Sequence, residues 1–389
     1  MIGDYILLLD IGLVIICALI GAAIFQRFKM PPVVGMVLAG IILSPFTPGY
    51  YVDAQDISFF SQIGAILLMF VIGLQFDYRT FGSQSKWGFM LAGFGCIVTF
   101  IVGTVVGLFL GWSYEYSLLL GALFVPTSTT ISLRLLEEMN VGHSKLSDAL
   151  KASIIIDDFY GFIAFALISS QLGISSVAGT ELLSSAFYMI LYTVLIFLIG
   201  IVVTPKIFNM AEKVFPHSAL SLGTAFCLII SYTVVVFNLS PIIGAFLAGT
   251  ILTSSFAHRQ VLESVEPMKN LFGSIFFASI GLSIDPLSII PVLPMALLLS
   301  AIAFISKAIP ASAFMFWRGE TLLKSLVLGS ATGPRGEVLL IIAQTAVASQ
   351  LVGADFLSLA TSIVVFTAIS TPLVMKTIMA NVKSTHKKR

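Results

Sequence analysis

Apolar residues fall in long, nearly uninterrupted runs along this chain, instead of the alternating or single-faced patterns of soluble proteins. A helix needs about 20 apolar residues to cross the hydrocarbon core, whereas a membrane barrel shows alternation over segments of about ten residues. The pattern predicts an all-α polytopic membrane protein. We predict thirteen transmembrane spans, at residues 5–25, 32–48, 57–75, 86–111, 115–137, 149–170, 181–203, 218–238, 241–256, 268–283, 288–315, 322–350 and 355–378, the tenth of them interrupted by Gly273 and Gly281.

Composition agrees with a membrane protein. Charged residues make up 10% of the chain and hydrophobic residues 58%, whereas soluble domains average about 25% charged. The charges are few and scattered, so they give no indication of nucleic-acid binding. Three cysteines, Cys17, Cys96 and Cys227, lie in apolar spans without metal-ligand spacing, and we interpret them as packing residues.

Lysine and arginine collect in alternate connections between the predicted spans. Eighteen of the twenty basic residues fall in every second connection or in the C-terminal tail. Because cytoplasmic connections are enriched in Lys and Arg, this predicts an outside N-terminus and a cytoplasmic C-terminus. The two exceptions, Lys307 and Arg335, lie within predicted spans.

Five ionisable residues are predicted to lie deep in the membrane: Asp157, Asp158, Lys307, Arg335 and Glu337. A charge at the bilayer centre costs at least about 2.5 kcal/mol, so such residues usually face a polar cavity or a partner. Adjacent helical residues point about 100° apart, so one aspartate can face a water-filled path while the other faces a neighbouring helix. We interpret the aspartate pair as a cation and proton site.

Two of the predicted spans contain helix-breaking sequences. In span 115–137, Pro126 removes an amide donor and frees the carbonyl four residues earlier. Span 322–350 contains the sequence Thr-Gly-Pro-Arg-Gly-Glu at 332–337. Irregular backbone at this depth is tolerated where protein buries it or where it lines a cavity. The first break is followed by four hydroxyl residues that could bind a cation: Thr127, Ser128, Thr129 and Thr130.

The order of whole and broken spans repeats. Spans four to six and spans eleven to thirteen both follow the order whole, broken, whole, and the predicted topology gives the two triplets opposite directions. This order is expected of an inverted-repeat secondary transporter, whose site lies between two discontinuous helices near the midplane.

The ionisable residues within the membrane are expected to form pairs, because burying an unpaired charge is unfavourable in free energy. A lone buried lysine is unfavourable, so we expect one aspartate to pair with Lys307 and the other to face the ion. We interpret Arg335 and Glu337 as forming core structural ion pairs, with each other or with polar groups of the core. Ser153, one helical turn before Asp157, is a further candidate ligand of the cation.

Several of these features together resemble the cation:proton antiporter-2 family, which includes bacterial Na+/H+ exchangers and Kef-type potassium efflux systems. The resemblance covers essentially the whole chain. It rests on the aspartate pair with Gly161, on the hydroxyl-rich first break, on Lys307, on the sequence 276–286 and on Gly-Pro-Arg-Gly-Glu at 333–337.

The resemblance implies a homodimer in which a six-helix core domain moves like an elevator against a dimerisation domain. It implies dimerisation segments at 1–75 and 218–283, core repeats at 86–170 and 288–378, a linker helix at 181–203 and a basic cytoplasmic tail at 379–389. It also implies that Asp158 is the main ion and proton carrier and that Asp157 is the partner of Lys307. The aspartate pair resembles the motif of the electrogenic exchangers, whereas Kef-type chains usually carry Gln-Asp at these positions. Kef-type chains also continue into a soluble nucleotide-binding domain, which we do not expect here.

We therefore expect a cell-membrane secondary transporter that exchanges Na+, with Li+ as a second candidate, for H+. No cofactor is expected. The main alternative is a K+/H+ antiporter or a Kef-like K+ efflux pathway. A non-transporting receptor or assembly subunit has no reason to keep buried charges between two breaks, and an enzyme is disfavoured because the sequence shows no nucleophile-and-base arrangement or metal-ligand cluster.

Overall fold

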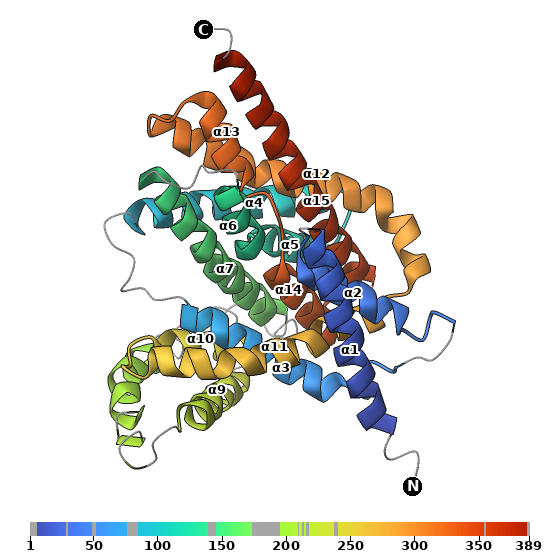
Figure 1. Ribbon diagram of the computed structural model, residues 1–389, viewed down its shortest axis with the longest axis vertical. Coiled ribbons are helices and arrows are strands. Elements are labelled where there is room, and N and C mark those ends of the chain that lie inside the picture. Colours follow the sequence, from blue (N-terminus) through green and yellow to red (C-terminus); the bar gives the residue numbers. More distant parts are fainter. Residues whose placement is uncertain are drawn as a thin grey trace. The chain divides into compact units, whose positions relative to one another are not determined.

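The computed structural model describes residues 6–28, 30–48, 52–75, 85–138, 145–172, 195–208, 210–211, 214, 218–236, 240–353 and 355–386, and these residues form helices and short connections without any strand (Figure 1). This confirms the predicted all-helical fold. The labelled helices are α1 (Ile6–Arg27), α2 (Pro32–Ile42), α3 (Ser58–Gln75), α4 (Ser85–Phe109), α5 (Tyr114–Phe124), α6 (Thr129–Glu138), α7 (Lys145–Leu172), α9 (Ala219–Val235), α10 (Pro241–Leu252), α11 (His258–Leu282), α12 (Pro286–Trp317), α13 (Leu322–Ser330), α14 (Glu337–Ala348) and α15 (Asp355–His386).

Most predicted spans match helices within a few residues, and both predicted breaks are confirmed. Five of the described helices, α1, α3, α4, α12 and α15, are at least 18 residues long and apolar enough to cross a membrane. Shorter apolar helices include α2, α9, α10, α14 and the helix Leu195–Phe208. The predicted linker span 181–203 lies partly outside the described residues.

The start of one helix and its interruption were predicted wrongly. Helix α11 begins at His258, ten residues before the predicted span, and it runs unbroken through Gly273 and Gly281. Its first turns are polar but still helical, because ion pairs such as Arg259–Glu263, with 2.8 Å between Nε and Oε1, support an exposed helix. The apolar part of α15, Asp355–Met379, matches the predicted span 355–378, and the helix itself continues to His386.

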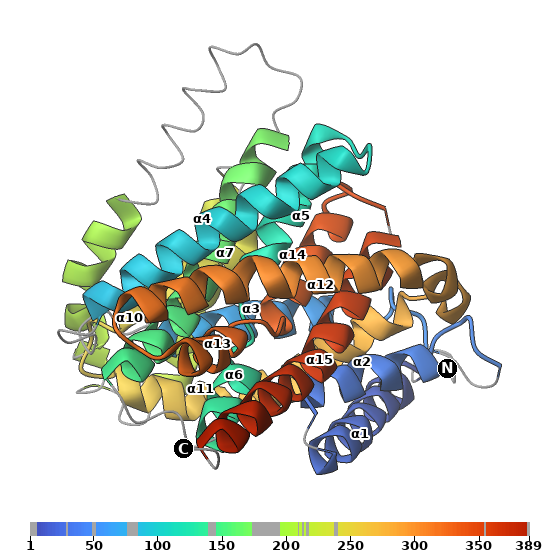
Figure 2. The ribbon, with the colours of Figure 1, turned by 90° about the horizontal axis from the view of Figure 1, so that it is seen from above.

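The chain divides into two compact units. The first unit comprises residues 1–20, 36–80 and 166–283, and in it α3 packs against α10 and α11, while α9 packs against α10. The second unit comprises residues 21–35, 81–165 and 284–389. In this unit α12 packs against α4, α13 and α15 (Figure 2).

Helices of the first unit cross with their backbones in contact at paired glycines. A Cβ atom added at Gly281 of α11 would overlap the carbonyl oxygen of Val37 in α2, and its next neighbours are backbone atoms that include the Cα of Gly40. Gly73 of α3 and Gly249 of α10 meet in the same way. Gly281, which together with Gly273 suggested an interruption, therefore serves close packing between helices.

We predict that Gly281→Ala destabilises the protein markedly. The added methyl group meets a backbone carbonyl that cannot move aside, and overpacking of this kind costs about 1–3 kcal/mol or more. The matched control is Gly12→Ala in α1, because a Cβ atom there has no neighbour within 4 Å. The unfolding temperature in detergent should fall for Gly281→Ala and stay constant or rise for Gly12→Ala; equal values would contradict this account of the crossing.

Candidate cation site

The two helix breaks of the second unit are joined by hydrogen bonds. Between α5 and α6 the chain is non-helical from Pro126 to Ser128, and between α13 and α14 it is irregular from Ala331 to Gly336. The Ser128 amide donates to the Pro334 carbonyl at 2.8 Å, and the Arg335 Nη1 atom donates to the Pro126 carbonyl at 3.1 Å. Each broken segment thus provides hydrogen-bond partners for backbone groups of the other segment that have no partner within a helix.

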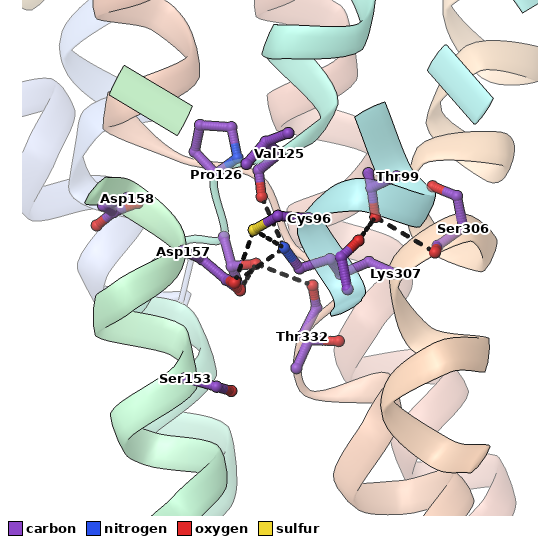
Figure 3. Close-up of polar contacts among 12 residues, drawn as sticks. Cys96, Thr99, Val125, Pro126, Ser153, Asp157, Asp158, Ser306, Lys307 and Thr332 are labelled. Atoms are coloured by element: carbon purple, nitrogen blue, oxygen red, sulfur yellow. Dashed lines mark hydrogen bonds and ion pairs between the residues drawn. The ribbon is translucent and has the colours of Figure 1, made fainter. Parts of the chain in front are cut away.

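Asp157 and Lys307 form a buried ion pair beside the first break (Figure 3). The Lys307 Nζ atom lies 3.0 Å from Asp157 Oδ1 and also donates to the Val125 carbonyl at 2.9 Å. Thr127 Oγ1 donates to Asp157 Oδ2 at 2.9 Å. Asp157 and Lys307 are 1% and 2% exposed, so the pair is held by direct contacts with the protein.

Cys96 is part of this cluster, which sequence reasoning missed. Its Sγ atom donates to Asp157 Oδ1 at 3.3 Å and accepts from Lys307 Nζ at 3.4 Å. The interpretation of Cys96 as a packing residue was therefore incomplete. The sequence does place Cys96 midway along the unbroken helix that precedes the first break. A cysteine in an apolar span, however, has no spacing pattern that marks it as part of a site.

Asp158 lies on a different side of α7 from Asp157 (Figure 3). It is 7% exposed, and Thr129 Oγ1 donates to its Oδ2 atom at 3.3 Å. Its Oδ1 atom is buried without a hydrogen-bond partner among the residues that the structure describes. Glu337 is close enough for its charge to act on Asp158. One carboxylate oxygen at the end of a broken helix is thus available for a further ligand.

The remaining predicted ligands take different positions. Ser128 is buried and contributes its amide to the contact between the breaks. The side chain of Thr130 lies outside the described residues. Ser153 donates to the Leu150 carbonyl of its own helix at 2.8 Å, so its hydroxyl is engaged away from both aspartates.

Arg335 is fully buried and contacts backbone carbonyls. Besides Pro126, its guanidinium donates to the carbonyls of Ala303 and Thr332, and its own amide donates to Thr367 Oγ1 at 3.0 Å. Arg335 was predicted to form a structural ion pair with Glu337 or to contact polar groups of the core, and its guanidinium contacts in the described residues are hydrogen bonds to main-chain carbonyls. Glu337 is the first residue of α14 and is partly buried.

Charged side chains lie at the helix ends beside the first break, and each charge is opposite in sign to the helix dipole at that end. The ammonium of Lys307 and the guanidinium of Arg335 bind carbonyls just after α5, where a helix dipole is negative. Asp158 accepts from Thr129 at the start of α6, where the dipole is positive. Helix ends that would be unfavourable in hydrocarbon therefore face complementary charges, and this unit offers hard oxygen ligands for a cation.

The chain is similar to known cation antiporters. The chain is 27% identical to the "Na(+)/H(+) antiporter" of Enterococcus hirae over 366 residues, which cover 94% of this chain and 96% of that protein. It is 32% identical to the potassium-efflux system protein KefC of Escherichia coli over 272 residues, which cover 67% of this chain and 42% of KefC.

The fold is also similar to a solved structure. The sodium proton antiporter MjNhaP1 of Methanocaldococcus jannaschii at pH 8 superposes with a TM-score of 0.74 at 15% identity, over 97% of both chains. The family model described as "Sodium/hydrogen exchanger, transmembrane" matches residues 14–380, nearly the whole chain. The chain therefore belongs to the transmembrane sodium/hydrogen exchanger family.

Proposed function

We propose that this protein exchanges Na+, with Li+ as an accepted congener, for H+ across the cell membrane. The observation that carries the proposal is the Asp158 carboxylate, which is buried at a helix break with one oxygen unpartnered among the described residues. The neighbouring Asp157 is compensated by Lys307, whereas Asp158 has a threonine hydroxyl as its described hydrogen-bond partner. The Na+/H+ antiporters among its relatives support the same function.

Competition for one carboxylate couples the two fluxes. A partly dehydrated Na+ binds ionised Asp158 and nearby hydroxyl and carbonyl oxygens of the first break, and a proton binds the same carboxylate when Na+ leaves. Both ligands cannot occupy it together, so transport of one in one direction requires transport of the other in return.

Lys307 is the proposed second proton carrier, which makes exchange electrogenic. Its Nζ atom contacts Asp157 and the carbonyl end of α5. Release of a proton from Nζ on cation binding adds a second proton to each cycle, so that net charge crosses the membrane. If the ammonium stays protonated throughout, it acts as a brace for the first break and one proton exchanges for one cation.

Lys307→Ala separates these roles. We expect this variant to lose about 3–5 kcal/mol of stability, because Asp157 is left buried without its partner, and to lose the effect of membrane potential on exchange. Unfolding in detergent and exchange under an imposed potential measure the two effects. Lys324→Ala is the matched control, since Lys324 pairs with Glu320 in a partly exposed position. Lower stability with unchanged voltage dependence would leave Lys307 the role of brace alone.

The domain roles follow from the family resemblance. We propose that the second unit holds the transporting core and that the first unit forms the interface of a homodimer. We further propose an elevator movement of the core, an outside N-terminus and a cytoplasmic C-terminus. A cross-linking experiment in membranes, with cysteines placed on α1, tests the dimer, and labelling of the C-terminus in sealed vesicles of known orientation tests the topology.

A cation panel in proteoliposomes tests the main proposal. Purified protein is reconstituted with a fluorescent pH probe inside, and Na+, Li+, K+ and choline are added outside in turn. Proton movement with Na+ and Li+, and none with choline, is expected. No response to any cation across pH 6 to 9 would refute cation/proton exchange.

K+/H+ exchange is the second candidate. The similarity to KefC and to the "Na(+)/H(+)-K(+) antiporter GerN" of Bacillus cereus favours it. Selectivity depends on the number and spacing of the ligands around Asp158, which residue types alone do not determine. A larger response to K+ than to Na+ in the same panel would select this function.

A further inference from the structure

We propose that Arg318, Trp87 and Trp317 form a binding site for the headgroup of an anionic phospholipid. Arg318 directly follows α12, and its Cζ atom lies 3.8 Å from the centroid of the Trp87 ring in α4 and 5.9 Å from that of the Trp317 ring. All three residues belong to the second unit, and none is among the residues proposed to bind the cation. The inference therefore adds a ligand to the proposed function and does not depend on it.

The site lies where two apolar helices end together. The apolar span of α4 is Lys86–Phe109 and that of α12 is Ile289–Trp317, so Trp87 is in the first turn of one span and Trp317 is the last residue of the other. The two helices pack against each other (Figure 2), and the ring centroids of Trp87 and Phe314 are 6.3 Å apart. Indole rings at the ends of spans are typical of the membrane–water interface, where phospholipid headgroups lie.

The guanidinium of Arg318 lies over an aromatic ring and keeps its N–H groups available. Arg318 is exposed, and its side chain forms no hydrogen bond or ion pair with the residues that the structure describes. The neighbouring carboxylate of Glu320 is paired with Lys324, with 2.8 Å between Oε1 and Nζ. A guanidinium carries five donors in one plane and matches a phosphate group with two parallel hydrogen bonds. The chemistry therefore fits a phosphate.

The turn after α12 holds the backbone of Arg318 in place. Gly319 has a φ of +97°, a conformation that favours glycine. The amides of Gly319 and Glu320 donate back to carbonyls in the last turn of α12, at 3.0 and 3.1 Å. These bonds satisfy carbonyls at the helix end, whose partial negative charge would otherwise oppose an anion. The site is thus built from a defined turn and from two packed helix ends.

The apolar surface beside the guanidinium favours a lipid over a soluble anion. Trp317 is 68% exposed and Phe316 is 56% exposed. Such side chains gain free energy from contact with acyl chains, which a soluble anion does not offer. Lys86, exposed in the first turn of α4, adds a positive charge at the same end. In the proposed topology this end faces the cytoplasm, where the leaflet contains anionic lipids.

Fluorescence quenching tests this site directly. The chain has three tryptophans, so a Trp112→Phe background keeps Trp87 and Trp317 as the reporters. The background protein is reconstituted in phosphatidylcholine vesicles with an increasing share of phosphatidylglycerol that is brominated on its acyl chains. Bromine quenches the fluorescence of tryptophans that the lipid contacts.

Three variants are compared in that background. Arg318→Gln should need about fivefold more phosphatidylglycerol for half-maximal quenching, because it loses the charge and most of the N–H donors. Arg318→Lys should fall between the two, because lysine keeps the charge but lacks the planar fork. Arg259→Gln is the matched control and should follow the background curve, since Arg259 is an exposed arginine of the first unit that pairs with Glu263.

Each outcome decides for or against the lipid site. A shift confined to the Arg318 variants supports it. Coincident curves for the background and Arg318→Gln would overturn it, and so would equal quenching by brominated phosphatidylcholine, which carries no net charge. Glycerol 3-phosphate has the headgroup chemistry without acyl chains; loss of quenching on its addition would identify a soluble anion as the occupant instead. If Arg318→Gln does not fold, Arg318→Lys carries the test, and an unshifted lysine curve would then contradict the inference.

Discussion

Asp158→Asn should reduce cation-driven proton movement at least about a hundredfold while the protein stays folded. Asparagine preserves the shape of the side chain but has no negative charge to offer a cation and no proton to exchange. Two opposite charges 4 Å apart gain about 4 kcal/mol at an effective dielectric constant of 20, which corresponds to a loss of roughly a thousandfold in affinity. The readout is dissipation of a pH gradient by Na+ in proteoliposomes.

The matched control for this variant is Asp148→Asn. Asp148 lies on the same helix, α7, but its side chain is 59% exposed and lies 3.6 Å from Lys151 in an ion pair. This variant should transport like the wild type, because exposed ion pairs contribute little. Normal exchange by Asp158→Asn would remove Asp158 from the mechanism, and an equal loss in both variants would indicate a general effect of charge on α7.

Arg335→Leu should unfold at a markedly lower temperature than the wild type. The guanidinium binds carbonyls at both breaks and on α12, and leucine removes these charge-assisted hydrogen bonds. A hydrogen bond to a charged group contributes about 1.5–3 kcal/mol, so the expected loss of stability is several kcal/mol. Arg335→Lys should fall between the two, because lysine keeps the charge but lacks the planar fork that reaches several acceptors.

Arg318→Leu provides the control for loss of a guanidinium. Arg318 follows α12 and lies over the ring of Trp87, with its Cζ atom 3.8 Å from the ring centroid, in an exposed position. Loss of an exposed cation–π contact costs about 0.5–1 kcal/mol. Thermal unfolding in detergent should rank Arg335→Leu below Arg335→Lys and both below Arg318→Leu; an Arg335→Leu protein as stable as the Arg318 variant would show that the breaks need no guanidinium.

The sequence was sufficient to predict the broken helices, because proline and glycine at membrane depth have few structural interpretations. It also singled out Asp157, Asp158 and Lys307, since each buried charge needs a compensating partner. Helix ends were harder to predict. The start of α11 at His258 was missed because its first turns are polar, and polarity separates membrane from water but does not separate helix from loop.

The sequence did not predict which side chains form hydrogen bonds with one another. The hydroxyls after Pro126 were predicted as one group around the cation, yet Thr127 bonds to Asp157 and Thr129 bonds to Asp158. The course of the broken backbone decides that division, and periodicity does not apply there. The contact of Cys96 depends likewise on the register between α4 and α12, which no local pattern specifies.

The glycine crossings of the first unit limit how its helices can move. The main chains of two helices touch only where a glycine of one helix lies opposite a glycine of the other. This is the case for Gly40 with Gly281 and for Gly73 with Gly249. A slide of one helix by a single turn would bring a side chain against a carbonyl, so each pair has one permitted axial alignment. Sliding at these two crossings is therefore unfavourable, and a displacement during a transport cycle would carry the helices of each crossing together.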